Sequence, residues 1–205
     1  DVYITKVLKR DATGAIAVAA DGSLSSMDLP NGERLRIGNT NPDFTLGWRN
    51  NISWKGLNLS FLINARVGGI VTSETQAVLD QFGVSKATAE ARDRGYVEVA
   101  GGQRVDPQKY YEVVANQQLL GYYYYSATNI RLQNVSLTYT LPKTLLGQGW
   151  PGITVGFIAN NLWMIYNKAP FDPELTASTG TYGQGNDYFM QPSLRSYGFN
   201  IKFKF

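Results

Sequence analysis

The stretch FTLGWRNNISWKGLNLSFLINARV, residues 44–67, carries the strongest structural signal in the chain. Every second residue from Phe44 to Trp54 is apolar except Asn50, and the same alternation runs from Leu57 to Val67. A period of two is typical of a β-strand with one apolar and one polar face. Residues 44–54 and 57–67 are therefore predicted strands, joined by a tight hairpin at Lys55-Gly56.

Three later stretches repeat the pattern, at residues 130–141, 153–161 and 194–205. The alternation slips at Gln133-Asn134, which predicts a β-bulge. Residues 2–8 are a weaker sixth candidate, because Lys6 falls on the apolar face. The Trp and Tyr residues at or near strand ends suit an aromatic girdle at a membrane interface: Trp48, Trp54, Tyr139, Trp150 and Trp163.

The connections between these strands alternate between short and long. The long ones span residues 9–43, 71–129 and 162–193, whereas the turns at 55–56 and 142–152 are short or moderate. A compact soluble domain rarely carries such long loops, but transmembrane β-barrels do so routinely, and their strands need about 9–11 residues. Lipid offers no hydrogen-bond partner, so such strands must pair into a closed cylinder.

Composition excludes several classes of function. The 205 residues include no His and no Cys, so Ser-His, thiolate and His- or Cys-ligated metal chemistry cannot arise within the chain. A net charge of +3 without a long basic run gives no sign of nucleic-acid binding. No apolar run is long enough for a transmembrane helix. The chain is predicted not to be an enzyme and to need no cofactor. Since it starts without a signal peptide or an initiator Met, it is expected to be a piece of a longer protein.

Pattern alone leaves one alternative fold open. A soluble β-sandwich or a small lipocalin-like barrel also has one apolar and one polar face. The alternation of short and long loops and the aromatic end at Phe205 favour the membrane barrel.

Several motifs resemble those of the SusC/RagA-like TonB-dependent outer-membrane transporters. They occur in the family's order, from about Ile37 to Phe205, and the first 36 residues match less clearly. The motifs are Ile37-Gly38-Asn39-Thr40-Asn41-Pro42-Asp43-Phe44, Arg66-Val67-Gly68-Gly69, residues 126–142 (SATNIRLQNVSLTYTLP), Ala159-Asn160-Asn161-Leu162, Phe171-Asp172-Pro173-Glu174, Gly185-Asn186-Asp187 and Gln191-Pro192-Ser193-Leu194-Arg195-Ser196-Tyr197.

The resemblance implies a fold class and a function. The fold would be all-β, with antiparallel strands that form the C-terminal part of a transmembrane β-barrel of about 22 strands. Its long extracellular loops would contain short helices. The function would be TonB-dependent import of oligosaccharides, glycans or peptides across the bacterial outer membrane. The implied partners are a SusD-like surface lipoprotein, the TonB–ExbB–ExbD machine and outer-membrane lipid. This chain lacks the plug, the TonB box and enough strands, so the rest of the transporter is expected to complete the barrel.

The strand directions then divide the chain into six segments. Residues 1–43 are a strand candidate plus an extracellular loop, 44–70 a barrel hairpin, and 71–129 a long extracellular loop. Residues 130–161 are two strands joined by a periplasmic turn, 162–193 an extracellular loop and 194–205 the last strand. In the long loop, Ser73 with Gln76 and Asp106 with Pro107 predict helix starts, and Gly121 predicts the end of the second helix.

Candidate binding residues lie near the outer strand ends. Tyr122, Tyr123, Tyr124 and Tyr125 form a run whose rings suit stacking on sugars, although an aromatic girdle is the favoured interpretation. Asn160, Asn161 and Arg195 are placed to hydrogen-bond substrate, plug or a neighbouring loop, with a structural role as the alternative.

Two further assignments concern metal and assembly. Asp172, Glu174 and Asp187 are candidate Ca²⁺ ligands in an extracellular loop, against the alternative of ordinary loop hydrogen bonds. The aromatic end at Phe205 resembles the signal read by the barrel-assembly machinery. It would also serve simply as the last lipid-facing residue.

Two other functions stay open on sequence alone. A soluble β-rich carbohydrate-binding or adhesion domain would have the same alternation, and would stay in solution without detergent. A passive porin-like barrel would lack the TonB box and plug.

Overall fold

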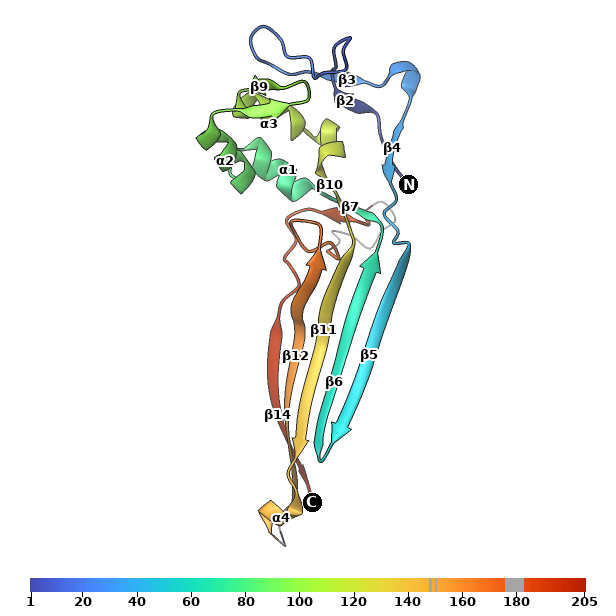
Figure 1. Cartoon of the computed structure of the whole chain (residues 1–205), viewed down its shortest axis with the longest axis vertical. Coiled ribbons are helices and arrows are strands. Elements are labelled where there is room, and N and C mark those ends of the chain that lie inside the picture. Colours follow the sequence, from blue (N-terminus) through green and yellow to red (C-terminus); the bar gives the residue numbers. More distant parts are fainter. Residues whose placement is uncertain (148, 150, 176–182) are drawn as a thin grey trace. The chain divides into compact units, whose positions relative to one another are not determined.

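The computed structural model describes residues 1–147, 149, 151–175 and 183–205. The chain folds as two compact units (Figure 1). The sheet unit comprises Pro42–Gly68, Ala127–Pro173 and Gln191–Phe205. The helical unit comprises Asp1–Asn41, Gly69–Ser126 and Glu174–Met190.

The sheet unit is built on five long antiparallel strands, which lie side by side in Figure 1. Their order in the sheet is β14-β12-β11-β6-β5, so each strand pairs with its neighbours in chain order. This meander confirms the five predicted barrel-type strands. The bounds are β5 Phe44–Trp54, β6 Leu57–Val67, β11 Asn129–Thr140, β12 Gly152–Asn167 and β14 Ser196–Lys204.

The predicted hairpin between β5 and β6 is confirmed. Trp54 pairs directly with Leu57, and both turn residues have positive φ, 44° at Lys55 and 85° at Gly56. Two positive φ angles are the geometry of a type I′ turn, whose twist matches that of paired strands. A Cβ on Gly56 would also lie 2.8 Å from the carbonyl oxygen of Thr140. Both the positive φ and this close approach therefore favour glycine at the position.

The bulge predicted at Gln133 is confirmed. Leu132 pairs with Ile63 and Asn134 with Leu62, so Gln133 is an extra residue on β11 relative to β6. On the other side of β11, Leu132 pairs with Trp163 and Asn134 with Asn160, which leaves Asn161 and Leu162 opposite Gln133. Asn161 has a φ of 50° there.

The sheet unit differs from the prediction at one strand end and in one turn. The strand expected to end at Asn161 continues to Asn167, because the irregularity at Asn161 shifts the alternation without ending the pairing. The turn between β11 and β12 contains a short helix, α4 (Lys143–Leu146), which the Gly- and Pro-rich sequence did not indicate. Trp150, assigned to the aromatic girdle, lies outside the described residues.

Pairing across the five strands separates apolar from polar residues row by row. Three neighbouring rows on one face are Trp54-Leu57-Tyr139-Val155-Ile201, Ile52-Leu59-Leu137-Phe157-Phe199 and Asn50-Phe61-Val135-Ala159-Tyr197. The rows between them are Ser53-Asn58-Thr138-Gly156-Asn200, Asn51-Ser60-Ser136-Ile158-Gly198 and Arg49-Leu62-Asn134-Asn160-Ser196. Opposite residues of antiparallel strands point to the same side. The sheet therefore has one apolar and one polar face.

The apolar face is not buried within the chain. Phe199 is 84% exposed, Trp54 65% and Leu46 57%. An exposed apolar surface of this extent is unusual for a soluble monomer and marks contact with lipid or with another protein. Within the described residues, β5 and β14 each pair on one side only, so their outer edges carry backbone groups that still need partners.

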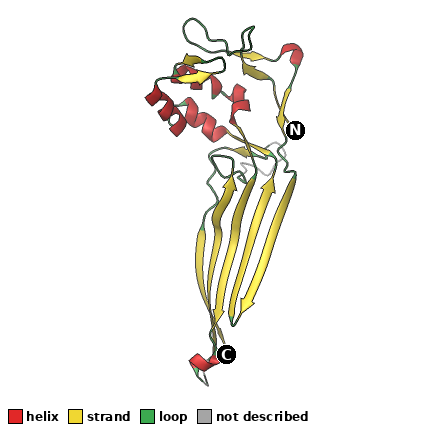
Figure 2. Cartoon of the chain, viewed as in Figure 1, coloured by secondary structure: helices red, strands yellow, loops and turns green. Residues whose placement is uncertain are grey.

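Short strands and helices make up the helical unit, with the helices red in Figure 2. None of the helices in the described part of the chain is long and apolar enough to cross a membrane. The strands are β1 Val2–Ile4, β2 Lys6–Leu8, β3 Ser26–Asp28, β4 Leu35–Gly38, β7 Ile70–Ser73, β8 Val97–Val99, β9 Gln103–Val105, β10 Tyr124–Ser126 and β13 Asn186–Asp187. The helices are η1 Pro30–Gly32, α1 Glu74–Gln81, α2 Lys86–Arg94, α3 Pro107–Val114 and η2 Gln117–Tyr123.

The weak strand candidate at residues 2–8 is not a long strand. It forms β1, which pairs with β4, and β2, which pairs with β3. Thr5 interrupts the two, and both belong to the helical unit rather than to the five-stranded sheet. The mixed polarity of this segment fits its partial burial.

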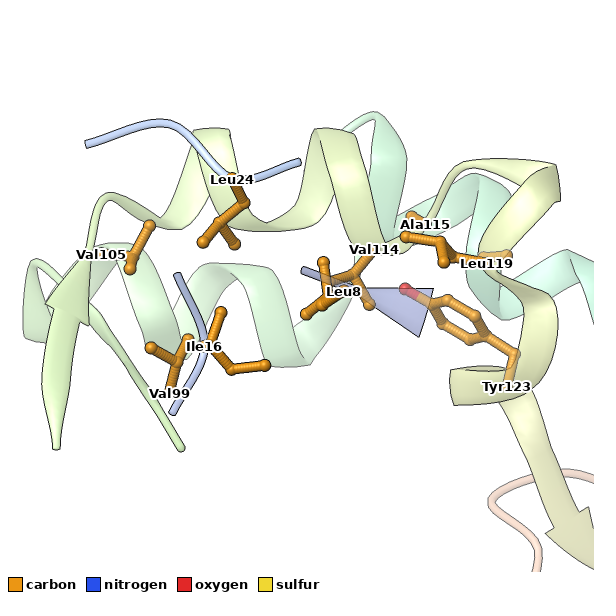
Figure 3. Close-up of a cluster of buried hydrophobic side chains, with 10 residues drawn as sticks. Leu8, Ile16, Leu24, Val99, Val105, Val114, Ala115, Leu119 and Tyr123 are labelled. Atoms are coloured by element: carbon orange, nitrogen blue, oxygen red, sulfur yellow. The ribbon is translucent and has the colours of Figure 1, made fainter. Parts of the chain in front are cut away.

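The helical unit has its own hydrophobic core (Figure 3). Side chains from the β2 segment, the loop that follows it, α3 and η2 meet there, and Leu119 is 2% exposed. The buried members are Leu8, Ile16, Leu24, Ala77, Val99, Val105, Val114, Ala115, Leu119 and Tyr123.

Helix starts were predicted correctly, and one helix end was not. Ser73 caps α1 by accepting the N–H of Gln76, and Asp106 caps α3 by accepting the N–H of Lys109, with Pro107 in the first turn. The end predicted at Gly121 is wrong: α3 stops at Val114, and a separate 3₁₀ segment, η2, covers Gln117–Tyr123.

Helix α2 was not predicted, although its caps are visible in the sequence. The Ser85 hydroxyl accepts the N–H of Thr88 at 3.2 Å, the Thr88 hydroxyl donates to the Ser85 carbonyl at 2.8 Å, and Gly95 ends the helix with a φ of 81°. Replacing Ser85 by Ala is therefore expected to reduce the free energy of local opening of α2 by about 0.5–2 kcal/mol.

Hydrogen exchange of the α2 amides in the full-length protein measures this loss. Lys86→Ala is the control, because its pair with Glu90 at 3.6 Å is exposed and should contribute under about 0.5 kcal/mol. Equal protection in Ser85→Ala and in the parent protein would contradict the role of the cap.

Candidate functional site

A buried ion pair joins β11 to the segment that follows β12. Nη2 of Arg131 lies 2.5 Å from Oδ1 of Asp172, and the two side chains are only 6% and 8% exposed. Nη1 of Arg131 also lies 3.5 Å from the Ser193 hydroxyl. A buried charge is tolerated when it is paired. The ion pair and the contact with Ser193 together connect three separate stretches of the sheet unit.

Asn167 shapes the segment that delivers Asp172. Its Nδ2 donates to the carbonyls of Ala169 at 2.9 Å and Phe171 at 2.7 Å, and its Oδ1 accepts the N–H of Ala169 at 3.1 Å. An Asn side chain that bonds to the backbone two to four residues ahead holds a tight turn. The turn brings Asp172 back to β11.

A cavity of about 230 Å³ lies beside this ion pair, within the sheet unit. None of the ion pairs found among the described residues involves Arg195, so its guanidinium charge is available to the cavity. Trp163, 58% exposed, supplies an aromatic face. The cavity is lined by Arg131, Asn161, Trp163, Met164, Asn167, Asp172, Pro192, Ser193 and Arg195.

A ladder of polar side chains crosses the sheet next to the cavity. Asn134 Nδ2 donates to Asn160 Oδ1 at 2.8 Å, and Asn160 Nδ2 donates to the Ser196 hydroxyl at 2.9 Å. Asn161 Nδ2 donates to the carbonyl of Leu194 at 3.1 Å. The ladder fixes the start of β14 against β12. Amides, a guanidinium and an indole together can bind a ligand rich in hydroxyl or carbonyl groups.

Comparison with known proteins finds one relative in sequence and similar structures of one importer. No protein-family model matches the chain. It is 25% identical over 201 residues to the TonB-dependent receptor P3 of Formosa agariphila, an alignment that covers 94% of this chain and 19% of the relative. The RagAB peptide importer in its closed-closed state matches with a TM-score of 0.61 at 21% identity, covering 98% of this chain and 21% of that one. The open-open state matches with a TM-score of 0.63 at 23% identity, covering 93% and 20%.

The predicted resemblance to the SusC/RagA-like TonB-dependent transporters is confirmed. The chain spans about a fifth of the length of these relatives. The likeness to the importer structures establishes the fold: an antiparallel barrel segment of the SusC/RagA type.

The ion pair connects motifs that carry the SusC/RagA resemblance. Arg131 belongs to the stretch 126–142, Asp172 to Phe171-Asp172-Pro173-Glu174, and Ser193 to the stretch 191–197. Sequence reasoning named Asp172 only as a metal ligand, and missed Arg131 and Asn167 as site residues. An arginine inside an otherwise uncharged strand was the available signal, because a charge there needs a partner.

The predicted binding residues separate into two groups. Asn161 and Arg195 line the cavity in the sheet unit, and Asn160 belongs to the ladder beside it. The four tyrosines belong to the helical unit and do not form one aromatic surface. Tyr122 is 43% exposed, Tyr124 and Tyr125 lie half-buried in β10, and Tyr123 is 4% exposed.

Tyr123 has a place in the core. Its hydroxyl donates to Oδ2 of the buried Asp80 at 3.0 Å, and its ring packs in the cluster of Figure 3. Burial and the neighbouring Asp80 carboxylate raise the pKa of Tyr123 far above its usual value, so the hydroxyl stays protonated. The Tyr123 side chain is therefore part of the core of the helical unit.

The three candidate calcium ligands have different surroundings. Asp172 pairs with Arg131 in the sheet unit. Asp187, in the helical unit, accepts the Ser73 hydroxyl at 2.7 Å, and Glu174 is exposed. Among residues 1–147, 149, 151–175 and 183–205, no three acidic side chains gather in a way that could hold a metal ion. The ordinary alternative, loop hydrogen bonds and ion pairing, describes Asp172 and Asp187.

Phe205 continues the apolar row of β14. It follows the strand directly, lies two positions after Phe203, and its side chain is fully exposed. Its assignment as an assembly signal stays a prediction.

Proposed function

We propose that this chain forms part of the wall of an outer-membrane transporter that imports nutrients with energy supplied through TonB. The observation that carries the proposal is the five-stranded antiparallel sheet, whose exposed face is apolar and whose opposite face is polar. Such a sheet suits lipid on one side and a wet interior on the other.

Strand length supports the same proposal. An 11-residue strand is about 36 Å long at roughly 3.3 Å per residue. At the tilt of about 45° usual for barrels it would cross about 25 Å, the height of the apolar band of such proteins. The unpaired edges of β5 and β14 would then be completed by the remaining strands of the transporter.

The substrate we propose is an oligosaccharide or glycan, with a peptide as the second candidate. The cavity lined by Trp163, Asn161 and Arg195 supports the first, because aromatic faces and amides suit sugars. The likeness to the structure of the RagAB peptide importer supports a peptide. By the same likeness we propose a SusD-like lipoprotein and TonB–ExbB–ExbD as partners.

The experiment that tests this proposal uses the full-length gene in its own host. Cells are offered labelled oligosaccharides and labelled peptides separately, and uptake is compared between the parent, a deletion of the gene and a deletion of tonB. The proposal expects one class of probe to enter, and both deletions to abolish its uptake. Uptake that survives the tonB deletion would indicate a passive pore, and recovery of the protein in the soluble fraction would refute a membrane barrel.

A further inference from the structure

The helical unit contains a cavity of about 330 Å³ between the end of α1, α2 and α3. This size is within the range of small-molecule sites. Charged side chains of both signs line it, together with the aromatic rings of Phe82 and Tyr111. The charged members are Asp80, Arg92 and Glu112.

Asp80 gives the cavity its negative side. It is 6% exposed, and its carboxylate accepts hydrogen bonds from Gln76 Nε2 at 2.7 Å and the Tyr123 hydroxyl at 3.0 Å, both neutral donors. None of the ion pairs found in the described part of the chain includes Asp80. A buried carboxylate held only by neutral donors favours a cation nearby.

The negative charge of Asp80 acts on a tyrosine that lines the cavity. Burial raises the pKa of the Tyr111 hydroxyl, and the Asp80 carboxylate raises it further. Tyr111 lines the cavity, so it offers a protonated hydroxyl there. Glu112, one residue along α3, adds a second carboxylate.

Arg92 supplies the positive side. Its Nη1 donates to the carbonyl of Gly83 at 2.5 Å, and the Gly83 N–H donates to the Asp80 carbonyl at 3.0 Å. The guanidinium therefore lies at the end of α1, roughly one helical turn, about 5 Å, beyond Asp80. A guanidinium has five N–H donors, so one bond to Gly83 leaves others for a ligand.

We propose that this cavity binds the zwitterionic backbone of a free amino acid or dipeptide. The ammonium group faces Asp80 and Glu112, and the carboxylate faces Arg92. A dipeptide extends over about 7 Å, which suits the separation of the two charges. Phe82, 73% exposed, and Tyr111 contact the side chain. The site belongs to the helical unit and does not depend on transport.

Calorimetric titration of the purified full-length protein with four probes tests the ligand chemistry. The probes are the dipeptide Ala-Phe, its N-acetylated form, its C-terminal amide, and maltose. Saturable binding of Ala-Phe is expected, weakened about tenfold or more by either modification, because each removes a charge-assisted hydrogen bond. Failure of Ala-Phe to bind, or equal binding of the blocked forms or of maltose, would overturn the proposal.

Variants locate the binding. Asp80→Asn keeps the shape of the side chain and should remove the preference for the free amine, and the exposed Glu112→Gln should weaken it if Asp80→Asn fails to fold. Arg92→Gln should remove the preference for the free carboxylate. Asp93→Asn is the matched control, since Asp93 is exposed on α2 and does not line the cavity. Binding unchanged in Glu112→Gln and Arg92→Gln would place the ligand elsewhere and refute the site, whatever the outcome of the uptake experiment.

Discussion

Replacing Val135 by Arg is expected to destabilise the membrane-inserted protein by about 2–4 kcal/mol. Val135 lies in one of the three apolar rows of the sheet, with Phe61 and Ala159 opposite it. If this face meets hydrocarbon, a guanidinium placed there must give up its hydration or distort the bilayer. The amount of folded, heat-modifiable protein in the outer membrane, and its urea unfolding in lipid vesicles, measure the loss.

Ser136→Arg is the matched control for this prediction. Ser136 is the next residue of the same strand and lies on the opposite face of the sheet, between Ser60 of β6 and Ile158 of β12. A change of at most about 1 kcal/mol is expected, since the added side chain would extend into water. Equal damage from the two substitutions, or greater damage at Ser136, would show that the faces are assigned wrongly.

Asp172→Ala is expected to cost about 3–5 kcal/mol, because it leaves the Arg131 guanidinium buried without its carboxylate. The loss should appear first in the segment 167–173, whose backbone is tied to β11 through this pair. Hydrogen exchange of that segment and the urea midpoint of the full-length protein in vesicles measure it. The cavity beside Arg195 should open at the same time.

Two further variants distinguish the effect of breaking the buried pair from the effect of removing charges in general. The double variant Arg131→Met with Asp172→Leu replaces both charges by apolar groups, and should recover most of the stability. Arg36→Ala breaks an exposed pair with Asp1, 2.9 Å long, and should cost under about 1 kcal/mol. A double variant as unstable as Asp172→Ala would mean that the charges themselves are needed.

The strands of the sheet were predictable because the polarity of each strand residue indicates the face of the sheet on which its side chain lies. Alternation located β5 and β6 to the residue and placed the bulge at Gln133. It failed after Asn161, where a positive φ and an extra residue change which side chains share a face while the ladder continues to Asn167. A local pattern cannot distinguish a shifted strand from a strand that has ended.

The helical unit shows where local signals are insufficient. The sequence indicated the helix caps at Ser73 and Asp106. It indicated the cap at Ser85 equally well, but helix α2 was not predicted. The four tyrosines are identical in sequence, yet Tyr123 alone is fully buried, since its partner Asp80 lies 43 residues earlier in the chain. Which tyrosine enters the core is decided by that distant contact.

The candidate site depends on the same kind of distant pairing. Arg131 and Asp172 are 41 residues apart, and neither residue considered alone indicates the ion pair that they form. Asp172, Glu174 and Asp187 suggested a calcium site, because carboxylate oxygens are the usual ligands of Ca²⁺. The structure gives Asp172 a guanidinium partner instead.

Site-directed spin labelling along β11 tests the central claim most directly. The chain contains no cysteine, so single cysteines at Val135, Ser136, Leu137 and Thr138 can each carry a nitroxide in the full-length protein, with any cysteine outside this chain first replaced. In lipid vesicles, oxygen accessibility should alternate with a period of two and be highest at Val135 and Leu137. Maxima at Ser136 and Thr138, or no alternation, would contradict a sheet with one face in lipid.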